Sequence, residues 1–318
     1  MDKGHRQADK ILAEITDEML KVFDAVERKV IKKVKDYLKK FEAEIKEHEQ
    51  MVDDGEMTQR EFEQWYVSRV TTGREWETFR NKLAQDYHDA TVDAMAKAGA
   101  GLLLVYSFNK QYAGDQITKQ INTFFHRNYT PNKNKKPRRP KGILPKSPDP
   151  LKNLPWHRKK IESVIRSGMK KGKSVDEIAR RLHKVTNMDA VSAYRAVRTG
   201  VTCAENEARI DAMFDAQQQG IAYDKIWMAT LDDRTRVAHR VMHGERVPCD
   251  AYFSNGLFEP ADPSGDPEEI YNCRCTLLWV PAGMPMEIEE GPDGMGKLEW
   301  SAQKPKSKPY PKWTKKNG

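Results

Sequence analysis

Two pairs of residues in the last third of the sequence have the chemistry of metal ligands. His239 and His243 are four residues apart, and Cys273 and Cys275 are separated by a single residue. A disulfide between two cysteines this close would be strained. Two imidazole nitrogens and two thiolates are a donor set that suits a tetrahedral zinc ion. The sequence therefore offers a structural zinc site on His239, His243, Cys273 and Cys275.

The same region would also fit a clasp of polar contacts without a metal. His239 would then hydrogen-bond Asp232 or Asp233. The cysteines would pack in the core, and Arg274 would pair with an acid. The Asp233 carboxylate could cap a helix start, while an arginine fork holds a distant loop. The pattern favours this clasp over zinc, and its residues are Trp227, Asp233, Arg234, Thr235, Arg236, His239, Gly244, Asn272, Cys273, Arg274 and Cys275.

The elements around these residues predict a small α+β module over residues 222–282. The segment of Trp227 is expected to be a strand that lies against a final strand over 273–280. The loop between them is rich in proline and glycine, which makes it irregular. Upstream, Ser174 and Glu177 form a capping box that begins a short helix. A second helix is expected after a turn, through Ala193 and Val201.

This helix pair superficially resembles a helix-turn-helix, whose second helix would expose base-reading side chains near its start. Residues 189–192 occupy that place, and Asp-Ala-Val-Ser is poor chemistry for reading bases. An ordinary helical hairpin is therefore the favoured interpretation. A sequence-specific DNA-binding regulator stays as a third hypothesis for the function.

The N-terminal part has a helical pattern. Apolar residues recur from Leu12 to Ile45 with a mean step of about 3.7 residues, which is typical of a long helix. Asp53-Asp54-Gly55 should end it. Capping boxes at Thr58 and Thr72 should begin further helices. The predicted fold class is α+β and predominantly α-helical: a long N-terminal helical domain (1–128), a basic Pro-rich linker or arm (129–156), a small C-terminal α+β module (157–283) and a flexible Lys/Pro-rich tail (284–318).

The composition of the 318 residues suits a soluble protein, with 38% hydrophobic and 32% charged residues. The longest apolar run is far short of the roughly 20 residues of a membrane-spanning helix, so we expect no membrane to be required for folding. The first residues lack the apolar stretch of a secretory signal. With only four cysteines, the chain is expected to fold in a reducing cytoplasm.

The positive charge is concentrated in two segments. Residues 131–155 carry +7 and residues 304–318 carry +6, whereas the whole chain carries +8, which leaves the rest near −5. Both segments are rich in proline and read as extended, which favours a polyanion as their partner. The residues expected to contact DNA phosphates are Lys133, Lys135, Lys136, Arg138, Arg139, Lys141, Lys304, Lys306, Lys308, Lys312, Lys315 and Lys316.

Several short blocks between residues 160 and 280 resemble one family in both order and spacing. They are Arg198-Thr199, Asn206, Arg209, Trp227, Asp233-x-Arg-Thr-Arg-x-x-His239, Gly244, Phe253, Pro260-x-Asp262-Pro263 and Asn272-Cys-Arg-Cys275. The family is that of the phage minor head proteins, the head morphogenesis group with Mu F-like and SPP1-type members. The N-terminal helices and the lysine-rich tail lie outside the resemblance.

The resemblance implies a minor capsid protein of the virion interior, present in the host cytoplasm during assembly. It would act in head assembly and in genome packaging or delivery. The implied partners are the portal protein, the major capsid or scaffolding protein, and double-stranded DNA bound without sequence preference.

An enzyme carried in the virion is the alternative function. Some minor head proteins resemble, or are fused to, ADP-ribosyltransferases, and Glu287-x-Glu289 superficially matches the paired acids of those enzymes. A metal-dependent hydrolase built on His239 and Asp233 is a second form of this hypothesis. It would need an open coordination position, which two histidines and two cysteines would close.

Overall fold

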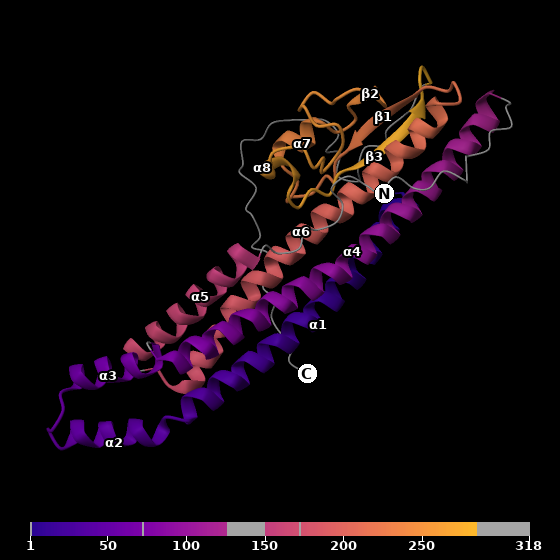
Figure 1. Ribbon diagram of the computed structural model, residues 1–318. Helices are drawn as coiled ribbons and strands as arrows, with labels where there is room; N and C mark the ends of the chain where they lie inside the picture. The colour runs from indigo at the N-terminus through magenta and orange to yellow at the C-terminus, as the bar shows by residue number, and fades with distance from the viewer. Residues whose placement is uncertain (1, 72, 126–149, 172, 285–318) are drawn as a thin grey trace. The chain divides into compact units, whose positions relative to one another are not determined.

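The computed structural model describes residues 2–71, 73–125, 150–171 and 173–284 (Figure 1). Helices predominate in these residues, and three short strands lie in the last third of the chain. This confirms the predicted fold class, α+β and predominantly α-helical. Within the described ranges, no helix is long and apolar enough to cross a membrane.

The described residues pack as two compact units. One unit contains residues 2–12, 101–125 and 198–284, and the other contains the remaining described residues. Three long helices contribute residues to both units: α1 (Lys3–Lys39), α4 (Arg74–Phe125) and α6 (Val175–Gln217). Each unit therefore combines distant parts of the sequence. The division of the chain into four consecutive segments stays a prediction.

In the second unit, the apolar stripe predicted for the first helix faces the core. The buried residues include Ile15, Met19, Val26, Val30 and Val34 of α1. The helix is not continuous to Ile45, however. It ends at Lys39, and α2 (Glu42–Asp53) begins after a short break. The predicted end at residues 53–55 is confirmed, because α2 ends there and Gly55 adopts a φ of 75°.

Two of the three predicted capping boxes form. Thr58 and Glu61 exchange hydrogen bonds at the start of α3 (Gln59–Thr71). Ser174 and Glu177 do so at the start of α6, which follows α5 (Pro150–Lys170). Thr72 lies outside the described residues. The predicted turn between two helices is wrong, because α6 continues through residues 189–192 as one helix.

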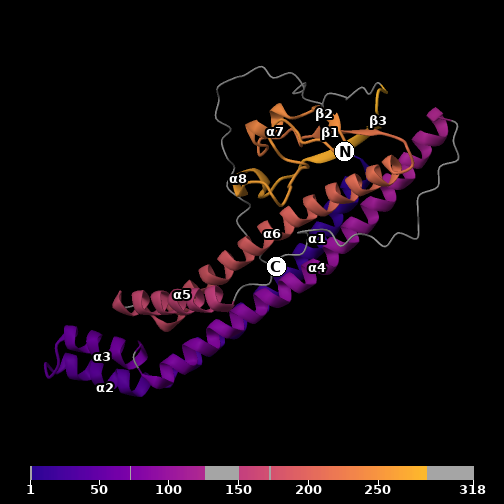
Figure 2. The ribbon, with the colours of Figure 1, turned by 45° about the horizontal axis from the view of Figure 1, so that its top comes forward.

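The three strands form an antiparallel sheet in the first unit. β1 (Tyr223–Met228) lies between β2 (Arg246–Pro248) and β3 (Thr276–Pro281). Trp227 pairs with Leu277 in the register of β1 and β3, so the predicted pairing of these segments is confirmed. Two short helices lie in the connections, α7 (Val237–Val241) and α8 (Pro267–Ile270). Figures 1 and 2 show the sheet and both short helices along the C-terminal half of α6.

Candidate functional site

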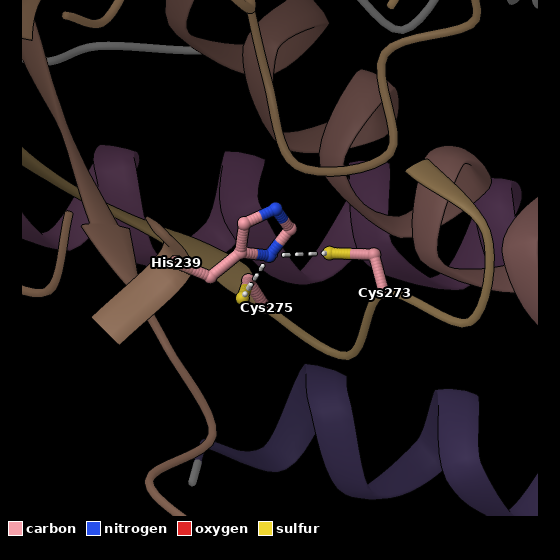
Figure 3. A group of neighbouring side chains, drawn as sticks. All are labelled: His239, Cys273 and Cys275. Carbon is pink, nitrogen blue, oxygen red and sulfur yellow. Dashed lines mark hydrogen bonds between the residues drawn. The ribbon is translucent and has the colours of Figure 1, made fainter. Parts of the chain in front are cut away.

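His239, Cys273 and Cys275 meet inside the first unit (Figure 3). His239 comes from α7, and the two cysteines lie in the segment that leads into β3. The Nδ1 atom of His239 is 3.6 Å from the Cys273 sulfur and 3.4 Å from the Cys275 sulfur. All three residues are buried, with about 1% of their surface exposed. The structure thus brings together three of the four residues that were expected as zinc ligands.

The other ring nitrogen of His239 contacts a carboxylate that the sequence did not point to. Nε2 lies 2.9 Å from Oε2 of Glu269, which is part of α8. The expected hydrogen bond from His239 to Asp232 or Asp233 is therefore wrong. Burial would lower the pKa of His239, but the contacts with Cys273 and Glu269 outweigh it and raise the pKa.

The two thiols have opposite tendencies to ionise. A hydrogen bond from Cys275 lowers the pKa of Cys273, and His239 lowers it further, so that it lies well below its usual value despite burial. The proximity of Cys273 and the burial of the site raise the pKa of Cys275. The pKa values of the two thiols are therefore shifted in opposite directions, and neither cysteine is part of a disulfide.

His243, the fourth predicted ligand, is not part of this group. Its Nδ1 accepts a hydrogen bond of 3.2 Å from the backbone N–H of Ala229. Gly244 follows with a φ of 82°, and its N–H donates to the Trp227 carbonyl. His243 thus fixes the end of β1. Among the described residues, the metal-ligand group contains one histidine and two cysteines.

The predicted polar clasp exists, but it is centred on Asp232 and not on Asp233. Both guanidinium nitrogens at the end of Arg274 donate to the Asp232 carboxylate. This contact holds the pKa of Asp232 well below its usual range. Asp233 is exposed, and α7 begins after Arg236 without a side-chain cap. The prediction that Arg274 pairs with an acid is confirmed, whereas the prediction that Asp233 caps a helix is wrong.

Further contacts connect residues 230–240 with residues 271–274. Arg236 donates to the Tyr271 carbonyl, and Thr230 donates to the Arg274 carbonyl over 2.7 Å. Thr235 is buried and its hydroxyl donates to Asp232, while Arg234 is exposed. Two segments that are about 35 residues apart in the sequence are thus held together before Cys273 and between the two cysteines.

Trp227 of β1 packs against His239 and Phe253. Its ring lies 5.3 Å from the His239 ring at an angle of 79°, and 5.1 Å from the Phe253 ring at 86°. Edge-to-face contacts of this kind stabilise aromatic pairs beyond simple burial. Asn272 adopts a φ of 57°, and its N–H donates to the Thr199 hydroxyl. These contacts fix the positions of His239 and of the chain that carries the cysteines.

The sequence of this region matches a known family. The model of the Phage Mu protein F like family matches residues 159–278, which include the whole site. The minor head protein GP7 of Bacillus phage SPP1 is 27% identical over 145 residues, or 42% of this chain and 47% of GP7. Residues 159–278 therefore resemble the phage minor head proteins in sequence.

A second relative has a different name. An NAD(+)--arginine ADP-ribosyltransferase EFV of Enterococcus faecalis is 30% identical over 165 residues, or 48% of this chain and 34% of that protein. The chain thus spans about a third and about half of the lengths of these two relatives. No solved structure matches it.

Within the residues that the family model matches, α6 presents a row of buried polar side chains to β3 and to the segment that carries the cysteines. The amide of Asn206 donates to the carbonyls of Pro260 and Cys275, and its oxygen accepts the N–H of Leu277. The Thr202 hydroxyl donates to the Cys273 carbonyl over 2.6 Å. Side chains of α6 therefore provide hydrogen-bond partners for buried backbone groups beside the site.

Arg209 extends this row into a buried charge network. It contacts Asp2 and Glu205 at 2.7 Å and donates to the Leu277 carbonyl. Burial favours a raised pKa for Glu205, but Arg209 and the hydrogen bonds from His5 and Thr276 hold it below its usual value. The resemblance contained Asn206 and Arg209. No sequence signal marked Asp2, His5 or Glu205, because the contacts of Asp2 with Arg209 and of His5 with Glu205 join residues about 200 positions apart.

The remaining predicted functional residues lie outside the described part of the chain. These are the twelve lysines and arginines expected to contact DNA, and the pair Glu287 and Glu289. Their roles therefore stay predictions from the sequence.

Proposed function

We propose that this chain is a minor capsid protein of the phage head interior that acts in head assembly and in genome packaging or delivery. The observation that carries the proposal is the match of residues 159–278 to the Phage Mu protein F like family, joined by the relationship to GP7. The proposed partners are the portal protein and packaged double-stranded DNA, with major capsid or scaffolding protein as further contacts. The protein would meet them in the host cytoplasm during assembly and stay in the virion.

A basic cavity in the second unit supports contact with a polyanion. The cavity has a volume of about 450 Å³ and is lined from α4 and α5 by Arg80, Pro155, Arg158, Lys159, Glu162, Ser163 and Arg166. Four of these residues are cationic, and a single acid, Glu162, pairs with Arg80 at 2.6 Å. Helix α5 carries six lysines and arginines against that one acid. Guanidinium groups gathered in this way suit phosphate oxygens.

DNA binding can be tested through its dependence on salt. Each lost phosphate contact should reduce the slope of log affinity against log salt by about 1. Arg158→Ala should have this effect with any duplex sequence. Arg60→Ala is the matched control, because Arg60 is an exposed residue of the same unit outside the cavity. Equal slopes for the wild type and Arg158→Ala would remove this cavity from the DNA-binding surface.

Portal binding requires a separate experiment. The chain should co-purify with the portal protein encoded in the same genome, at both moderate and high salt. Contacts that depend on the basic segments should weaken steeply with salt, whereas an apolar docking surface should not. Absence of the portal protein from the purified sample at every salt concentration would refute the assembly role.

The relationship to the ADP-ribosyltransferase keeps an enzyme as a second candidate. That relationship covers 34% of the named enzyme. The direct test is transfer of a labelled ADP-ribose group from NAD⁺ to an arginine-containing acceptor. Transfer by the wild-type chain that disappears in Glu287→Gln and Glu289→Gln would favour the enzyme over a purely structural role. We propose the structural role because His239, Cys273 and Cys275 are all buried, so that neither sulfur is exposed to a substrate.

A further inference from the structure

We propose that His239, Cys273 and Cys275 bind one zinc ion, with a water molecule as the fourth ligand. In a tetrahedral site, zinc lies about 2.0 Å from nitrogen and about 2.3 Å from sulfur, which places these two ligand atoms about 3.5 Å apart. The distances from Nδ1 of His239 are 3.6 Å to Cys273 and 3.4 Å to Cys275. The nitrogen therefore lies at the distance of such a site from both sulfurs, and all three ligand atoms lie within 4.8 Å of one another.

Glu269 prepares His239 for this role. Its carboxylate accepts a hydrogen bond from Nε2 over 2.9 Å, which leaves the lone pair of Nδ1 directed at the two sulfurs. A carboxylate behind a ligating histidine is a recurrent partner in zinc sites, where it fixes the tautomer and the ring orientation. Glu269 would act as a positioning residue and would not touch the metal.

The donor set and the burial favour zinc over a harder cation. Thiolate sulfur and imidazole nitrogen suit zinc, whereas calcium and magnesium prefer oxygen ligands. Two thiolates would neutralise the charge of a divalent ion, so the buried site would carry no net charge. Binding would release the thiol protons to solvent.

The position of the site explains what a metal would contribute. The chain between β1 and β3 contains a three-residue strand and two helices of four and five residues. Such a segment buries few regular backbone hydrogen bonds, and a metal that joins α7 to the entry of β3 would stabilise it. This inference does not depend on the proposed function, since a zinc clasp would serve a capsid protein or an enzyme equally.

The test is metal analysis of the full chain purified without chelator. The wild type should contain about one zinc per chain, and His239→Asn and Cys273→Ser should each contain at least about tenfold less. Two variants are matched controls. His243→Asn removes the histidine that the structure places outside the group, and Cys249→Ser removes another buried cysteine of the same unit. Both should retain the metal. Glu269→Gln should bind zinc about 10–100-fold more weakly.

Replacement of zinc by cobalt in the wild-type chain tests the ligand set without a variant, and so remains informative if a ligand variant does not fold. Bound cobalt should give thiolate-to-metal charge-transfer absorption together with the visible bands of a tetrahedral ion. A wild-type chain that holds no zinc and gives no such absorption would overturn the proposal. Retention of zinc by folded Cys273→Ser would also overturn it. Loss of zinc from folded His243→Asn would overturn the three-residue ligand set.

Discussion

Replacement of Arg209 tests whether the buried charge network stabilises the unit that contains the candidate zinc site. The Arg209 side chain is 0% exposed and contacts Asp2, Glu205 and the carbonyl of Leu277. Arg209→Met keeps most of the aliphatic volume and removes every one of these polar contacts. Glu205, which is itself 1% exposed, would keep only its hydrogen bonds with His5 and Thr276.

The expected loss of stability is large because one partner of a buried ion pair remains. Removing one member of such a pair costs about 3–5 kcal/mol. The carbonyl of Leu277 also loses a hydrogen-bond donor, which costs about 1–3 kcal/mol when it stays buried. These costs overlap, so we expect a total of about 3–5 kcal/mol in the free energy of unfolding.

Equilibrium unfolding in urea, followed by tryptophan fluorescence, measures this loss. Trp279 is a local probe, because its ring lies 5.4 Å from the Arg209 guanidinium carbon. Arg246→Met is the matched control: Arg246 pairs with Asp224 at 2.8 Å, but its side chain is 31% exposed. The control should lose at most about 1 kcal/mol. Equal losses in the two variants would refute the reasoning that burial decides the cost.

Two further predictions concern single carboxylates. Asp232→Asn should destabilise the chain by about 1–2 kcal/mol through its contact with Arg274, whereas exposed Asp233→Asn should stay within about 0.5 kcal/mol in the same unfolding assay. Burial raises the pKa of Asp189 to about 7, so the folded chain holds a proton that the unfolded chain releases. The stability from protonated Asp189 is therefore complete at low pH and is lost as pH rises from about 4 to 7. Over this range Asp189→Asn should become steadily more stable relative to the wild type, and a constant difference in unfolding free energy would contradict the assignment.

Features that depend on neighbouring residues could be predicted from the sequence. The apolar period of α1, the capping boxes at Thr58 and Ser174 and the end of α2 all depend on residues within one or two helical turns. The pairing of β1 with β3 also followed from the sequence, because two apolar segments bounded a loop rich in proline and glycine. The break between α1 and α2 did not, since both sides keep the same helical period.

Features that depend on the meeting of distant segments could not be predicted. A turn was expected between the helix that begins at Ser174 and the helix through Ala193, where several polar residues stand, but the helix continues because Ala190, Ala193 and Val197 on one side of it are buried. Burial of that face outweighs the weak helix propensity of the polar residues. Glu205 had no sequence signal either: Arg209 is four residues further along the same helix, but His5 comes from the first turn of α1.

The candidate site shows why ligand spacing alone selected three residues that lie together and one that does not. Histidines four apart share a face only where a helix spans both. Helix α7 ends at Val241 with Met242 as its C-cap, so His243 lies beyond it and turns towards the backbone of β1. Glu269 took the place expected for Asp232 or Asp233, although it is 30 residues from His239. The position of α8 brings it there, and no local spacing encodes that position. His243→Asn and Glu269→Gln therefore test the fold and the metal site together. The ligand spacing in the sequence predicts that His243→Asn loses zinc, whereas the structure predicts that this variant keeps it and that Glu269→Gln binds zinc more weakly.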